Sequence, residues 1–100
     1  MTVLRSHADH QTRYELRDDD DAFVAALTYT ADPSEPATWK ILLPGPGGTE
    51  DLYGTQRITA PDAGRVRSWL TPLIGEERAG ELAGAVDTSP PPTASWSAPS

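Results

Sequence analysis

The spacing of apolar residues changes once along this chain, close to the segment Thr59–Asp62. Before that segment apolar and polar residues alternate, as in half-buried strands, and after it apolar residues recur at helical spacing. Strands that come first and helices that follow favour an α+β fold. We therefore predict an antiparallel four-stranded β-meander, packed on one face by one broken or two short C-terminal helices, with a disordered C-terminal tail.

Four segments carry the strand pattern. Tyr14 and Leu16 alternate with charged residues in the first. The second, "AFVAALTYT", is rich in the aromatic and β-branched residues that favour strands, and alternation places Phe23, Ala25, Leu27 and Tyr29 on one face. The third, "TWKILL", places Trp39, Ile41 and Leu43 together, and the fourth, "LYGTQRIT", contains Gly54, where we expect a bulge or a close backbone approach.

The helical part begins near Pro61, which the first turn of a helix tolerates, with Thr59 and Asp62 resembling a capping box. Pro72 lies inside the first helical pattern and predicts a break near Thr71, because proline lacks the backbone N–H of the helical ladder. A second helix is expected after Gly75, with one apolar face made of Ala79, Leu82, Ala83 and Val86.

These patterns divide the chain into residues 1–11, a flexible N-terminus, residues 12–87, a single α+β domain, and residues 88–100, a disordered tail rich in proline and serine. A domain of this size buries little apolar surface, so dimerisation would stabilise it. We therefore expect a homodimer.

The charge balance limits the classes of partner. The net charge is −7, which opposes binding to nucleic acids and to anionic lipids, and seven of the eight basic residues are arginine, a usage typical of high-GC bacterial genomes. The absence of cysteine excludes disulfides and thiolate sites. The sequence shows no apolar run typical of a signal peptide or a membrane span, so we expect a cytoplasmic protein.

Three motifs invite catalytic or ligand-binding interpretations that their spacing does not favour. The four aspartates Asp18–Asp21 lack the ligand spacing of a calcium loop and are expected to form a hairpin turn. Ser6, His7 and His10 lie in a segment with no pattern that would fix them as a triad or a metal site. The glycines of "GPGGT" precede a strand, so a turn is favoured over a phosphate loop. We expect no catalytic residue, no metal and no cofactor.

The residues that we predict to bind a partner are Arg65, Arg67 and Trp69, which form a basic and aromatic cluster together with Arg57. Arginine and tryptophan dominate the energetics of protein interfaces. Arg65 and Trp69 are four positions apart on the expected helix and could stack, although a tryptophan that flanks the core explains the same pattern. Possible sheet-face contacts are Tyr29, Trp39 and Tyr53.

The sequence thus favours a small non-enzymatic protein-interaction or regulatory module with an unidentified protein partner. One alternative is a single-stranded nucleic-acid-binding sheet domain, on which Tyr29, Trp39 or Tyr53 would stack with bases. A second alternative is a precursor whose C-terminal tail is processed. An enzyme is not expected, since Glu50 and Asp51 are adjacent on a strand and would point to opposite faces.

Overall fold

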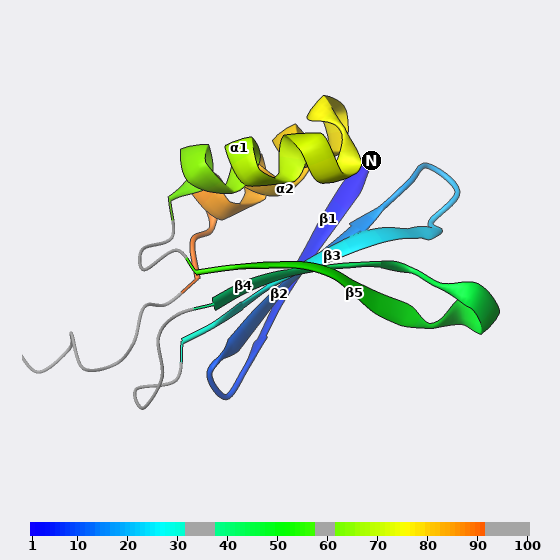
Figure 1. Cartoon of the computed structure of the whole chain (residues 1–100), viewed down its shortest axis with the longest axis horizontal. Helices are drawn as coiled ribbons and strands as arrows, with labels where there is room; N and C mark the ends of the chain where they lie inside the picture. Colours follow the sequence, from blue (N-terminus) through cyan, green and yellow to red (C-terminus); the bar gives the residue numbers. More distant parts are fainter. Residues whose placement is uncertain (32–37, 58–61, 92–100) are drawn as a thin grey trace, which may run out of the picture.

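A computed structural model describes residues 1–31, 38–57 and 62–91 of the chain. The chain forms an antiparallel sheet with two helices on one side of it (Figure 1). The elements are, in chain order, β1 (Thr2–Ala8), β2 (Gln11–Arg17), β3 (Phe23–Thr30), β4 (Thr38–Pro44), the short 3-10 turn η1 (Pro46–Gly48), β5 (Glu50–Gln56), α1 (Ala63–Ile74) and α2 (Glu76–Thr88).

The sheet is a meander in which each strand pairs with the next, in the order β1-β2-β3-β4-β5. The predicted α+β class, with antiparallel strands followed by two helices, is confirmed. The sheet has five strands instead of four, because the N-terminal residues form β1 at its edge. Residues 2–8 of the N-terminal segment 1–11, which we expected to be flexible, thus belong to the sheet.

The strand β1 escaped sequence prediction because its side chains do not alternate between apolar and polar. Val3 is the one partly buried residue of β1, and every other position is exposed. The strand is held by backbone pairing with β2 through a two-residue turn, Asp9–His10, in which Asp9 adopts a left-handed φ of 55°. Aspartate tolerates that conformation better than most residues.

The core lies between the sheet and the two helices. Register places Tyr14, Leu27 and Ile41 in one row across β2, β3 and β4, and all three are fully buried. Trp39, Ile41 and Leu43 share a face as predicted. Tyr29 and Trp39 pair across β3 and β4 with ring centroids 4.5 Å apart. Burial of these apolar rows against Val66, Leu70, Leu82 and Val86 is the principal stabilising contact of the fold.

A register shift near Leu16 changes the face of one residue. Phe23 pairs with Arg17, whereas Ala25 pairs with Leu16. Phe23 was expected on the core face with Ala25, but its ring lies 5.9 Å from the Arg13 guanidinium, and Val24 packs against the core instead. A bulge reverses side-chain direction because strand side chains alternate with a period of two.

The two helices meet at Gly75. Asp62 caps α1 by accepting a hydrogen bond from the Arg65 backbone N–H at 3.2 Å, while Thr59 and Pro61 lie outside the described residues. The break expected near Thr71 is displaced: Pro72 is accommodated inside α1, and the helix ends at Gly75, whose φ of 95° favours glycine. On α2 the predicted apolar face is buried.

The C-terminal boundary of the fold extends past the expected residue 87. The helix α2 runs to Thr88, and the backbone carbonyls of Ser89 and Pro90 accept hydrogen bonds from side chains of the sheet. Pro91 is buried. Of the expected tail 88–100, Thr88 thus ends α2, Ser89 and Pro90 contact Arg5, and residues 92–100 lie outside the described part of the chain.

Candidate functional site: a cleft between α1 and β5

The candidate site is a cleft of about 650 Å³ between the N-terminal part of α1 and the end of β5. Clefts of this size hold small ligands or a few residues of a partner protein. Its walls combine charged, polar and aromatic side chains: Gln56, Arg57, Asp62, Gly64, Arg65, Ser68 and Trp69. The cleft thus combines residues at the end of the last strand with residues of the first helix. These two elements lie on either side of the segment where the spacing of apolar residues changes from strand to helix.

Gly54 sets the distance between α1 and β5. A Cβ atom at this position would lie 3.3 Å from Leu73 Cδ1 and 3.5 Å from Trp69 Cζ2. The predicted close approach at Gly54 is confirmed, and the register also shifts beside it, because Ile41 pairs with Gly54 while Leu42 pairs with Leu52. The helix therefore packs on the face of β5, and Trp69 beside Gly54 is one of the residues that line the cleft.

Three of the four residues in the predicted basic and aromatic cluster line this cleft: Arg57, Arg65 and Trp69. Trp69 is half-buried. One side of it packs against the core, as expected for a tryptophan that flanks the core, and it also lines the cleft. The side chain of Arg65 is 73% exposed and lies 3.8 Å from the Asp62 carboxylate. The ring contacts among the described residues do not include the expected stacking of Arg65 on Trp69.

Arg67 is separated from the other cluster residues. Its position two residues from Arg65 turns it toward α2, where its Nη2 atom lies 3.9 Å from the place of a Cβ on Gly80. It lines a smaller groove between the helices, of about 240 Å³, together with Asp87. Arg65 and Trp69 are four positions apart and therefore share a helix face. Arg67 is two positions from each of them and lies on another face.

The predicted sheet-face residues have different environments. Tyr29 and Trp39 are 1% and 0% exposed beneath the helices, and burial raises the pKa of the Tyr29 hydroxyl. No described residue accepts a hydrogen bond from the buried indole N–H of Trp39. Tyr53, by contrast, is 56% exposed on the edge strand β5. Of these three aromatic residues, Tyr53 is therefore the one whose ring is exposed for stacking with a ligand.

The sheet face turned away from the helices carries a compensated charge network. The Arg13 guanidinium donates to both carboxylate oxygens of Glu50 at 2.8 Å and to Glu15 at 3.0 Å. Arg17 pairs with the same Glu15. Desolvation opposes ionisation of Glu15, but the hydrogen bond and charge of Arg13, with Arg17, outweigh it and lower the pKa of the Glu15 carboxyl.

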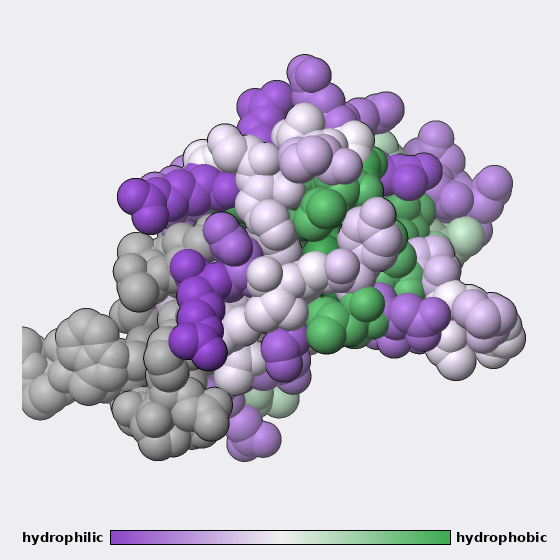
Figure 2. All heavy atoms as spheres, viewed as in Figure 1, coloured by the Kyte–Doolittle hydropathy of each residue, from purple (hydrophilic) through white to green (hydrophobic). Residues whose placement is uncertain are grey.

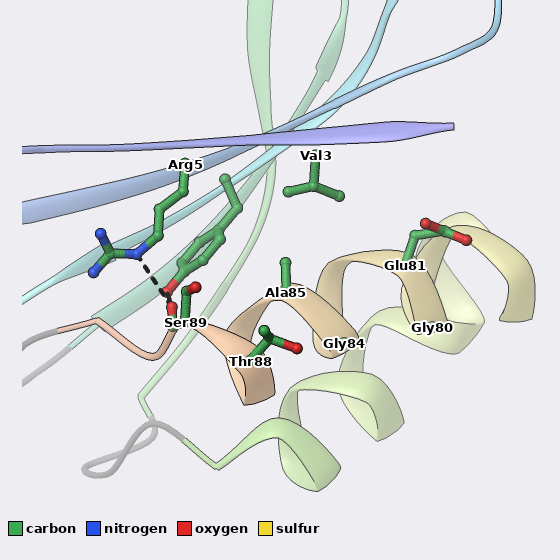
Figure 3. A pocket seen from close by; sticks show the side chains of 9 residues that line it. Val3, Arg5, Gly80, Glu81, Gly84, Ala85, Thr88 and Ser89 are labelled. Carbon is green, nitrogen blue, oxygen red and sulfur yellow. Dashed lines mark hydrogen bonds between the residues drawn. The ribbon is translucent and has the colours of Figure 1, made fainter.

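A second cavity, of about 540 Å³, lies between β1 and α2. Arg5 reaches from β1 across it to Ser89, and Val3 lies opposite Ala85 (Figure 3). Its polar groups are engaged in holding the chain, because the Arg5 Nε and the Tyr14 hydroxyl both donate to the Ser89 carbonyl, at 3.1 and 2.6 Å. Burial raises the pKa of Tyr14. These contacts give the cavity a structural role.

The other motifs form turns or pair locally. Asp18 Oδ1 accepts from the backbone N–H groups of Asp20 and Ala22, and Asp21 adopts a φ of 63°, as expected for a turn between β2 and β3. The glycines after β4 form η1, also a turn. His7 contacts Thr12 Oγ1 at 2.8 Å, while Ser6 is its neighbour on the strand and faces the opposite side. Within the described ranges no three His, Cys, Asp or Glu residues are placed to hold a metal ion.

Sequence reasoning did not identify Gln56 and Ser68 as cleft residues, because polar residues at a strand end and on a helix carry no pattern of their own. Comparison with protein-family models, with curated proteins and with solved structures finds no match. In the described part of the chain, no helix has the length and apolar character needed to cross a bilayer.

Proposed function

We propose that this protein is a small, non-enzymatic interaction module of the cytoplasm that binds a protein partner through the cleft between α1 and β5. The observation that carries the proposal is the convergence of Arg57, Arg65 and Trp69 on this cleft. Arginine and tryptophan side chains contribute most to protein interfaces, and this cleft has two guanidinium groups beside a half-buried indole.

The charge of the cleft favours an acidic partner segment. The chain as a whole carries a net charge of −7, so two arginines that line one cleft stand out against an acidic surface. Asp62 is the carboxylate that lies near Arg65, at a distance of 3.8 Å, which leaves the guanidinium available for a closer, bidentate contact. A carboxylate of a partner would bind there with an apolar group against Trp69.

The nucleic-acid alternative is less well supported. It requires accessible rings for base stacking and uncompensated cations along the sheet. Tyr29 and Trp39 are buried, and Arg13 and Arg17 are paired with carboxylates. The alternative of a processed precursor concerns residues 92–100, which lie outside the described residues, and it stays a prediction.

The test is affinity capture from the native cell with three versions of the chain. The variant Arg65→Glu reverses a charge of the cleft, and Arg78→Glu changes an exposed arginine on α2 as the matched control. We expect the control to retain the partners of the wild type and Arg65→Glu to lose at least one of them. Identical sets of partners for both variants, with unchanged circular dichroism spectra, would refute the proposal.

A further inference from the structure

The strand β5 forms an open edge of the sheet. Among the described residues it pairs with β4 alone, and α1 packs on its face at Gly54. Two large side chains near its centre are exposed, Leu52 by 57% and Tyr53 by 56%. In the space-filling view, hydrophobic atoms reach the surface in the middle of the face formed by α1 and β5 (Figure 2).

The sequence of β5 lacks the lysine and proline that often prevent one edge strand from pairing with another. Natural edges are protected by charged side chains, above all lysine, by proline, by bulges or by coverage by another element, and β5 has two acidic residues at its start and a bulge beside Gly54. The seven residues Glu50–Gln56 contain none of Lys, Arg or Pro. At the other edge of the sheet, β1 carries Arg5 and lies against α2. The two edges therefore differ in their ability to accept a further strand.

The charges on β5 identify the partner. Asp51 lies near the start of the strand, and Arg57 follows its end. Glu50 is neutralised by Arg13 at 2.8 Å, whereas Asp51 accepts from the hydroxyl of Thr49, a neutral donor. In antiparallel self-pairing the acidic end of one strand faces the basic end of the other, at both ends of the pair. Parallel pairing would bring like charges together.

We propose that a second copy of this chain pairs antiparallel along β5, so that the two five-stranded sheets join into one continuous sheet across a two-fold axis. The backbone groups of both edges then pair, and Leu52 and Tyr53 of each copy become buried at the junction. Asp51 of each copy lies toward Arg57 of the other. This contact shares Arg57 with the cleft, whereas Arg65 belongs to the cleft alone.

The test measures mass by light scattering at about 100 µM, a concentration at which a dimer of micromolar affinity is assembled. We expect the wild type to be a dimer. Leu52→Lys places a charge on the β5 edge and is expected to give a monomer. Leu4→Lys, at a 50% exposed position on β1, is the matched control and is expected to remain dimeric. A monomeric wild type, or equal behaviour of the two lysine variants, would overturn the proposal.

A mixing experiment tests the antiparallel arrangement. Asp51→Arg and Arg57→Asp each create two like-charge contacts in a homodimer, so each variant alone is expected to dissociate about tenfold more readily than the wild type. When the two variants are mixed, both contacts join opposite charges, and the dimer is expected to return. No recovery on mixing, with both variants folded, would contradict this arrangement. Arg65→Glu alters the cleft alone and is expected to dimerise normally, so the two proposals can fail separately.

Discussion

The hydroxyl of Tyr14 on β2 donates a hydrogen bond of 2.6 Å to the backbone carbonyl of Ser89, 75 positions later in the chain. Arg5 on β1 donates to the same carbonyl and to that of Pro90. These bonds satisfy the carbonyl groups that follow α2 and fix the end of the helix against the first two strands.

Shortening the chain is therefore expected to have different effects at two positions. A chain that ends at Pro91 keeps the contacts of Ser89 and Pro90, and we expect it to melt as the full chain does. A chain that ends at Asp87 loses them, together with the buried Pro91, and is expected to melt about 5 °C lower or more, equivalent to roughly 1 kcal/mol. Thermal denaturation followed by circular dichroism measures both. Equal midpoints would show that these contacts contribute nothing.

Substitutions of Gly54 and Gly84 test whether each glycine is required by close packing of its neighbours. A Cβ on Gly84 of α2 would meet no atom within 4 Å, so Gly84→Ala is expected to stabilise the protein by about 0.5–1 kcal/mol through helix propensity. Gly54→Val would force side-chain atoms against Leu73 and Trp69 and is expected to cost about 1–3 kcal/mol. Urea denaturation measures both changes. A stabilising Gly54→Val would contradict the close packing of α1 on β5.

One of the four carboxylates in the aspartate turn accepts backbone hydrogen bonds of the turn itself. Asp18 Oδ1 accepts two backbone hydrogen bonds, so Asp18→Ala is expected to lower the free energy of unfolding by about 1 kcal/mol. Asp20→Ala is the control, because its side chain is exposed in the same turn. Similar losses for the two variants, measured by urea denaturation, would show that the effect comes from the net charge and not from the turn.

Calcium or magnesium at millimolar concentration is expected to leave the thermal midpoint unchanged. A metal that bound the native state alone would raise it by mass action. The measurement is a titration during thermal denaturation, with Asp20→Asn combined with Asp21→Asn as the comparison. A saturable rise that this double variant abolishes would establish a metal site at the turn.

The ion pairs of Glu15 predict a loss of stability in acid. The pKa of Glu15 is lower in the folded protein than its ordinary value of 4.5, so the folded state binds the proton less tightly than the unfolded state does. The stabilising contribution is complete above that value and disappears as the pH falls through the folded-state pKa. Glu15→Gln is expected to flatten the decline in the free energy of unfolding below about pH 5. An unchanged pH profile would contradict the role of the Arg13 pair.

The fold class followed from the sequence because the two periodicities are local properties of the chain. Alternation in Ala25–Tyr29 and Trp39–Leu43 predicted the strands, and the helical spacing of Val66 with Leu70 predicted the helix that packs on them. Aspartate and glycine segments marked the turns, since their backbone preferences act within a few residues. The spacing of four between Arg65 and Trp69 likewise predicted a shared surface, and both line the cleft.

The tertiary structure decided the features that depend on distant residues. Val3 is the one residue of β1 that is not exposed, so this strand exists through backbone pairing with β2 and leaves no apolar pattern to detect. The burial of Tyr29 and Trp39 depends on which sheet face the helices cover, and both faces of β3 contain apolar residues. Arg5 donates a hydrogen bond to the Ser89 carbonyl, and Arg57 lines the same cleft as Trp69. Both arrangements depend on how distant segments pack together, which local periodicity does not encode.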